Sequence, residues 1–147
     1  MMPTTMTTTL KKQHGFSLIE LMVTVAIVAL LVGVAIPSYS KYMDRTRRLD
    51  AKAFLQEVAG EQIRYFSDNN VFATDMIELG YGGNATQDSP DGYYNISIAN
   101  AVPTSFTLTA TAITGKAQEN DIKCGNFILD STGLKGVTGT AGVDGCW

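Results

Sequence analysis

The chain has 147 residues, of which 45% are hydrophobic and 17% are charged, and its formal net charge at pH 7 is −3. This length allows one small domain, and the composition is that of a folded chain, which excludes disorder as the main state. The charge is unevenly distributed. From Asp68 to the C-terminus there are three basic and nine acidic residues, a net charge of −6, which argues against nucleic-acid binding by this half.

The first element is an apolar segment. Residues 16–36 read FSLIELMVTVAIVALLVGVAI, and only Ser17, Glu20 and Thr24 interrupt these 21 residues. A helix of this length extends roughly 31 Å, enough to cross a bilayer. A plain membrane anchor is one interpretation. A secretory signal peptide, cleaved after Ala35, is another.

Glu20 argues against both interpretations. An ionisable side chain near the start of a membrane helix is costly, so it normally has a partner or a function. Glu20 follows Phe16 by four residues. Cleavage before Phe16 would create an ammonium group one helical turn from this carboxylate. Glu20 could then neutralise its own N-terminus or that of a neighbouring subunit.

The segment Gly15-Phe16-Ser17-Leu18-Ile19-Glu20 resembles the type IV prepilin motif, in which a short basic leader ending in Gly precedes Phe, three residues, Glu and a long apolar run. The resemblance implies that prepilin peptidase cleaves between Gly15 and Phe16 and that Phe16 is N-methylated. It also implies that Glu20 meets the Phe16 amine of a neighbour during assembly. The expected location is the bacterial inner membrane, single-pass with the head in the periplasm, and after assembly an extracellular pilus.

Charge counting alone gives the opposite topology. The basic residues before the apolar segment are Lys11 and Lys12, and those after it are Lys41, Arg45, Arg47 and Arg48. The positive-inside rule would therefore place the C-terminal part in the cytoplasm. We set this aside because a cysteine pair favours an oxidising compartment, and because the prepilin resemblance implies a leader cleaved at the cytoplasmic face.

The helix is expected to continue beyond the apolar segment. Gly33 and Pro37 predict a kink where the apolar run ends. Residues 38–67 have an amphipathic pattern whose apolar stripe predicts a face that packs on a sheet. The stripe comprises Ala51, Phe54, Leu55, Val58, Gln62, Tyr65 and Phe66. The basic residues between Lys41 and Lys52 favour a solvated or lipid-headgroup face over a nucleic-acid site.

The C-terminal half is expected to be β-structure. Residues 68–92 predict a connecting loop with one helical turn near Asp75–Leu79, and alternation predicts strands at 93–99 and 106–112. Two shorter strands are expected at 126–130 and 134–137, giving an antiparallel meander of about four strands. The even cysteine pair, Cys124 and Cys146, favours a disulfide over two free thiols.

The sequence thus predicts an α+β type IV pilin fold. The expected parts are a leader (1–15), a transmembrane and assembly helix (16–37), an amphipathic helix (38–67), a connecting loop (68–92) and a β-sheet head (93–147) that contains the Cys124–Cys146 loop. From Arg64-Tyr65-Phe66 to the closing Cys146-Trp147, the order of short motifs resembles PilE-type minor pilins and the related ComP-like DNA-uptake pilins.

The resemblance implies a minor pilin that takes part in pilus initiation and assembly and in pilus-dependent adhesion, twitching motility or DNA uptake. Its expected partners are other major and minor pilin subunits, prepilin peptidase, the pilus assembly platform and the inner membrane. Two alternatives are a pilus-displayed DNA receptor, which the acidic distal half disfavours, and a pseudopilin of a type II secretion system. We expect no enzymatic activity, no cofactor, no metal site and no catalytic residue, because cleavage removes His14 and leaves the mature chain without histidine.

Overall fold

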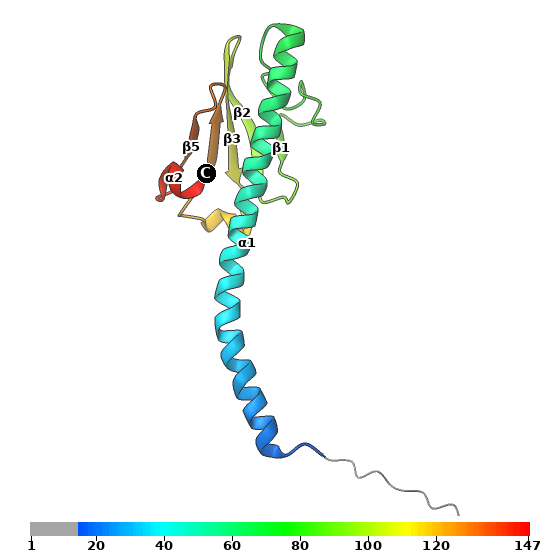
Figure 1. Ribbon diagram of the computed structural model, residues 1–147. Coiled ribbons are helices and arrows are strands. Elements are labelled where there is room, and N and C mark those ends of the chain that lie inside the picture. Colours follow the sequence, from blue (N-terminus) through cyan, green and yellow to red (C-terminus); the bar gives the residue numbers. More distant parts are fainter. Residues whose placement is uncertain (1–14) are drawn as a thin grey trace, which may run out of the picture. The chain divides into compact units, whose positions relative to one another are not determined.

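A computed structural model describes residues 15–147, which form two compact units that divide after Tyr39. The leader lies outside the described residues, apart from Gly15. One helix, α1, extends from Leu18 to Asn69 (Figure 1). It is uninterrupted at residues 33–37, so the kink expected at Gly33 and Pro37 stays a prediction.

The first unit contains the apolar part of α1. Every residue from Gly15 to Ile36 is exposed, and this helix is long and apolar enough to cross a membrane. An α-helix satisfies its backbone hydrogen bonds internally, which a segment in hydrocarbon must do. An exposed apolar surface of this extent requires lipid or other protein around it.

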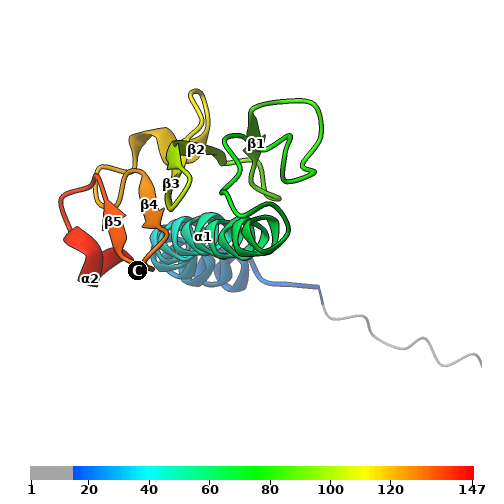
Figure 2. The ribbon, with the colours of Figure 1, turned by 90° about the horizontal axis from the view of Figure 1, so that it is seen from above.

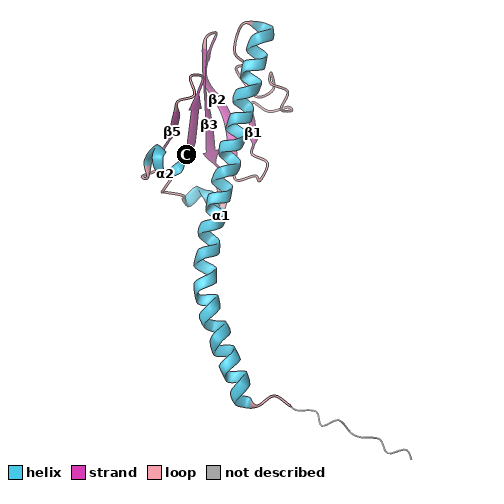
Figure 3. Cartoon of the chain, viewed as in Figure 1, coloured by secondary structure: helices cyan, strands magenta, loops and turns pink. Residues whose placement is uncertain are grey.

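The second unit is an α+β fold. Its sheet contains five antiparallel strands in the order β1-β2-β3-β4-β5, a simple meander. The strands are β1 (Thr86–Asp88), β2 (Tyr94–Val102), β3 (Ser105–Ala112), β4 (Phe127–Asp130) and β5 (Lys135–Val137). A 3₁₀ helix, η1 (Ala117–Asn120), connects β3 to β4, and a short helix, α2 (Gly142–Cys146), follows β5 (Figure 3).

The predicted fold class is confirmed, and the sheet has one strand more than expected. The additional strand is β1, which lies inside the segment predicted to be a loop. It pairs Thr86 with Ser97 and Asp88 with Asn95. With only three polar residues, Thr-Gln-Asp, β1 has no alternation to detect, and its pairing with β2 alone defines it.

The core lies between α1 and one face of the sheet (Figure 2). From α1 the predicted stripe supplies Ala51, Phe54, Leu55 and Val58, all buried. The strands supply alternate residues, as a sheet with one covered face requires. They are Tyr94 and Ile96 of β2, Phe106, Leu108 and Ala110 of β3, and Phe127 and Leu129 of β4. Burying each large apolar side chain contributes about 1.5–3 kcal/mol.

The segment after α1 also belongs to the core. Asn70 ends the helix with a positive φ of 57°, a conformation that Asn tolerates better than most residues. Ala73, Met76 and Leu79 are buried, although the sequence predicted a connecting loop here. The expected helical turn near Asp75–Leu79 is a hydrogen-bonded turn, in which Asp75 Oδ1 accepts from the N–H groups of Ile77 and Glu78.

Candidate functional site

The N-terminal motif forms a capping box at the start of α1. Glu20 Oε2 accepts a hydrogen bond from the Ser17 backbone N–H at 2.9 Å, and Ser17 Oγ accepts one from the Ile19 N–H at 3.3 Å. These bonds satisfy donors that a helix N-terminus otherwise leaves open. The spacing Ser-x-x-Glu is the usual signal of this role, which was not among the predictions from the sequence.

The capping box leaves part of the Glu20 carboxylate available. Among the described residues, Oε1 of Glu20 makes no hydrogen bond or ion pair. Phe16, which would become the N-terminus, is 88% exposed and immediately precedes the capping residue. The structure therefore brings Gly15, Phe16 and Glu20 into one short segment, with one carboxylate oxygen open to a further donor.

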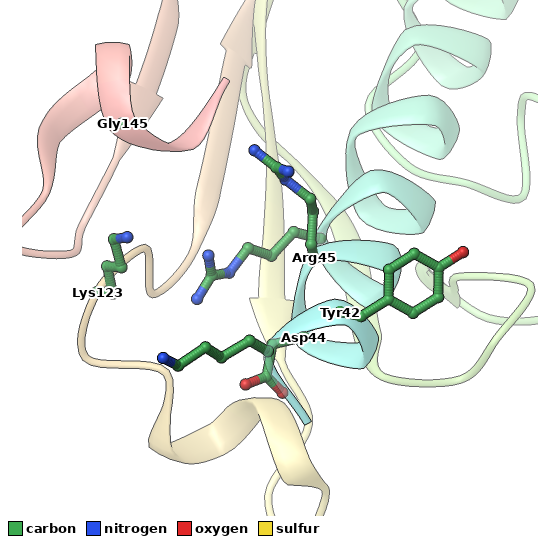
Figure 4. Close-up of a pocket in the computed structure, with 7 residues that line it drawn as sticks. Tyr42, Asp44, Arg45, Lys123 and Gly145 are labelled. Atoms are coloured by element: carbon green, nitrogen blue, oxygen red, sulfur yellow. The ribbon is translucent and has the colours of Figure 1, made fainter. Parts of the chain in front are cut away.

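The second feature is a basic pocket in the head. It has a volume of about 550 Å³ and is lined by Lys41, Tyr42, Asp44, Arg45, Arg48, Lys123 and Gly145. Figure 4 shows Arg45 on α1 and Lys123 on the segment between η1 and β4 lining this pocket together. The helical residues Lys41, Arg45 and Arg48 follow a spacing of four and three, which places them on one face of α1.

Two carboxylates next to this pocket are already paired. Arg48 donates two hydrogen bonds of 2.7 Å to the Asp121 carboxylate, and Arg47 lies 3.2 Å from Asp44. Lys41, Arg45 and Lys123 are exposed and have no ion-pair partner within residues 15–147. The pocket therefore carries an excess of positive charge.

The positive charge continues along α1. Lys52 donates a hydrogen bond to the Cys146 carbonyl at 2.8 Å. Its pKa is lowered by burial, and further by the positive charges of Arg48, Lys135 and Arg45. The Lys135 ammonium lies 5.0 Å from the centre of the Trp147 ring, a cation–π contact. Six of the nine lysines and arginines in residues 15–147 thus lie on one side of the head, namely Lys41, Arg45, Arg48, Lys52, Lys123 and Lys135.

The C-terminal disulfide places Lys123 and Gly145 at the pocket. Cys124 and Cys146 are bonded, with Cα atoms 5.6 Å apart, which confirms the predicted disulfide. The Gly139 N–H donates to the Cys124 carbonyl at 3.0 Å. A Cβ at Gly139 would collide with the backbone of Lys123 and Cys124, so only glycine permits this approach.

Charge counting along the sequence missed this basic side. The distal half has a net charge of −6, but two of its three lysines, Lys123 and Lys135, lie beside the cations of α1. The sequence did contain one signal for Lys123. It directly precedes Cys124, so its position in space is tied to that of the disulfide.

A capped apolar helix, an amphipathic helix on an antiparallel meander, and a C-terminal disulfide define a type IV pilin. The comparisons with known proteins agree. Residues 10–36 match the prokaryotic N-terminal methylation motif. Residues 37–128 match the family model described as "Type IV minor pilin ComP, DNA uptake sequence receptor". The chain belongs to this ComP-like family of type IV pilins.

Curated relatives point to the same class. The chain is 33% identical over 99 residues to the fimbrial protein EcpC of Eikenella corrodens, which covers 67% of this chain and 62% of EcpC. It is 29% identical over 108 residues to the type IV major pilin PilE of Neisseria gonorrhoeae, covering 72% and 62% of the two chains. These matches span less than two thirds of either relative. A fimbrial protein of Moraxella nonliquefaciens is 30% identical over 141 residues, covering 84% and 88%.

Proposed function

We propose that this chain is a minor pilin subunit of a type IV pilus. Prepilin peptidase removes residues 1–15 by cleaving between Gly15 and Phe16, and Phe16 is then N-methylated. Residues 16–37 hold the subunit in the inner membrane with the head in the periplasm. The pilus assembly platform then inserts it among other pilins, in a filament that serves adhesion, twitching motility or DNA uptake.

The observation that carries this proposal is the segment Gly15–Ile36. It is mostly apolar and every residue in it is exposed. Its one carboxylate, Glu20, accepts a hydrogen bond from the N–H of Ser17, the residue after the one that cleavage would make the N-terminus. A helix with apolar side chains on all sides is stable in a bilayer or among similar helices. A pilus subunit lies first in the bilayer and then among the helices of other subunits. Pilins are structural subunits rather than enzymes.

The family model supports the minor-pilin role over a type II secretion pseudopilin. The matched description is that of a minor pilin, and several relatives are fimbrial or pilus proteins. The remaining expected parts fit this role. The amphipathic helix (38–67), the connecting segment (68–92) and the head (93–147) would form the portion displayed on the filament.

The test is the mass and the location of the mature chain. Intact mass of the protein from sheared pili should match a chain that begins at N-methylated Phe16. Gly15→Val should leave the leader attached, because a bulky side chain obstructs the peptidase. Gly60→Val is the matched control, since a Cβ at Gly60 meets nothing within 4 Å. A mature N-terminus after Ala35, or a chain absent from pili, would contradict the proposal.

DNA reception is a second candidate. The family model describes a DNA uptake sequence receptor, and six cations on one side of the head offer phosphate contacts that the net charge of the distal half had disfavoured. Lys52, Lys135 and Trp147 line a groove of about 250 Å³ there. Duplex binding by the full chain should weaken with salt, and Lys135→Ala should reduce the salt slope by about one. Binding unaffected by salt and by Lys135→Ala would argue against this candidate.

A further inference from the structure

The basic pocket has unpaired cations and a defined volume. Its Asp44 lies beside Arg47, and Arg48 is neutralised by Asp121. Lys41, Arg45 and Lys123 face a space of about 550 Å³ without a partner among the described residues. Three like charges around one hollow repel each other, and an anion placed between them would relieve that repulsion.

The backbone on both sides of the pocket is held in place by contacts within the chain. Lys41, Arg45 and Arg48 are fixed by α1, which is helical on both sides of them. The opposite wall is held by the Arg48–Asp121 pair, by the disulfide, and by the Ala141 N–H donating to the Lys123 carbonyl at 2.9 Å. Because this backbone is already ordered, the entropy lost on binding is mainly that of the lysine and arginine side chains.

The chemistry of the lining suits a phosphate group. Guanidinium and ammonium groups are the usual protein ligands of phosphate, and Arg presents two parallel donors to its oxygens.

The position of these cations in the sequence indicates where the phosphate comes from. Lys41 follows the end of the apolar run, Ile36, by five residues, and Arg45 by nine. Long lysine and arginine side chains near the end of a transmembrane segment extend back to the lipid headgroup layer. We propose that this pocket binds the phosphate of an anionic phospholipid while the subunit is in the membrane.

This inference rests on the proposed function, because it requires residues 16–36 to be in a bilayer. It also gives a role to the basic residues after the apolar run, which the positive-inside rule places on the wrong side. A headgroup bound beside Arg45 and Lys123 would hold the head against the membrane surface until the subunit is extracted into the filament.

The test is native mass spectrometry of the full-length chain in mild detergent. The chain is titrated with phosphatidylglycerol and, separately, with phosphatidylcholine of the same acyl chains. We expect roughly 30- to 150-fold tighter binding of phosphatidylglycerol, because two to three cations contribute about 1 kcal/mol each and about 1.4 kcal/mol is tenfold. The double variant Arg45→Gln/Lys123→Gln should lose most of this preference.

Two controls make the result specific. Arg64→Gln/Lys116→Gln removes the same charge outside the pocket and should keep the preference. Trp147 fluorescence during heating verifies that both double variants fold. Equal binding of the two lipids, or an equal loss in the control variant, would overturn the proposal.

Competition identifies the source of the phosphate. Inorganic phosphate and a short duplex DNA are added at the same phosphate concentration as the lipid. Phosphatidylglycerol that stays bound supports the proposal. Displacement by inorganic phosphate would assign the pocket to a free anion, and displacement by DNA would assign it to nucleic acid. Absence of the chain from pili with an intact lipid preference would refute the proposed function alone.

Discussion

Arg48 and Asp121 lie 73 residues apart in the sequence and form a bidentate ion pair, with both N···O distances 2.7 Å. The two side chains are 17% and 6% exposed. Asp121 Oδ1 also accepts a hydrogen bond from the Cys124 N–H at 3.2 Å. This pair therefore joins α1 to the segment that carries the disulfide and Lys123.

Asp121→Ala should destabilise the head by about 3 kcal/mol. The change leaves a largely buried guanidinium without its partner, and an unpaired buried charge costs far more than the pair contributes. Urea unfolding of the full chain in mild detergent, followed by Trp147 fluorescence, measures the loss. Arg64→Ala removes an exposed pair with Glu61 and should change stability by less than about 1 kcal/mol. Equal losses of stability in the two variants would show that the Arg48–Asp121 pair stabilises the head no more than the exposed pair of Arg64 and Glu61 does.

Gln62 is the polar member of the apolar stripe, and the structure explains its presence. It is fully buried, and its amide both donates to the Ala73 carbonyl and accepts from the Ala73 N–H, each at 2.9 Å. Gln62→Met keeps the volume but leaves both backbone groups unsatisfied, which should cost about 3 kcal/mol. Urea unfolding measures this cost.

Gln56→Met, at an exposed position of the same helix, is the matched control and should be nearly neutral. A nearly neutral Gln62→Met would mean that the segment after α1 is held by Met76 and Leu79 alone.

Local patterns predicted the elements with strong periodicity. The stripe on α1 and the alternation of Phe106, Leu108 and Ala110 are confirmed, because burial on one face imposes periods of 3.6 and 2. The exact ends differ by a few residues, as for β2, which extends to Val102 beyond the expected end at residue 99.

Contacts between distant residues were not predictable in this way. Strand β1 depends on its pairing with β2, and the position of Ala73 depends on its two hydrogen bonds with Gln62. The basic side depends on the fold that places Lys123 beside Arg45, where the Arg48–Asp121 pair joins the two segments. The capping box of Ser17 and Glu20 is local and was available in the sequence, but the family motif offered a different role for Glu20.

Removing the disulfide should lower stability by roughly 3 kcal/mol. Cys124 and Cys146 are 22 residues apart, and closing a loop of this size restricts the unfolded chain by about that amount. Thermal unfolding of the full chain with and without reductant, read by Trp147 fluorescence, gives the shift. The double variant Cys124→Ser/Cys146→Ser should melt at the same lowered temperature in both conditions. Equal melting of the wild-type chain with and without reductant would contradict the prediction.

Stability should fall at alkaline pH because of Tyr94. Burial raises the pKa of Tyr94 to about 12, although the hydrogen bond from Gln118 partly opposes this. The unfolded chain loses this proton near pH 10, the folded chain near pH 12. The stability from the protonated phenol is therefore complete below pH 10. It is lost as the pH rises to 12, by up to about 2–3 kcal/mol.

Urea unfolding at several pH values between 9 and about 12 tests this, with Tyr94→Phe as the comparison. The phenylalanine variant should lose less stability over this interval. The stability of this variant should still change with pH, because burial and the hydrogen bond to Glu57 also raise the pKa of Tyr81. The lowered pKa of Lys52 acts in the opposite direction. Parallel curves for the wild type and Tyr94→Phe would refute the prediction.

The last prediction separates the two roles of Glu20. The carboxylate caps α1 through the Ser17 N–H, and the proposed assembly role requires its charge to meet the Phe16 ammonium of an adjacent subunit. Glu20→Gln keeps a side-chain oxygen for the capping box but removes the charge. Glu20→Val removes both. The measurements for each strain are membrane level, leader cleavage and abundance in sheared filaments.

If the charge is what assembly needs, both variants should insert and be cleaved normally, because neither places a new charge in the membrane. Both should be strongly depleted from filaments, since an ammonium left unpaired in apolar surroundings costs a few kcal/mol. Glu20→Gln at wild-type abundance, with only Glu20→Val depleted, would show that capping of α1 is the requirement and that no intersubunit pair forms. Loss of cleavage in both strains would move the role of Glu20 to recognition by the peptidase. The capping oxygen and the charge belong to one carboxylate, and the glutamine variant is the change that separates them.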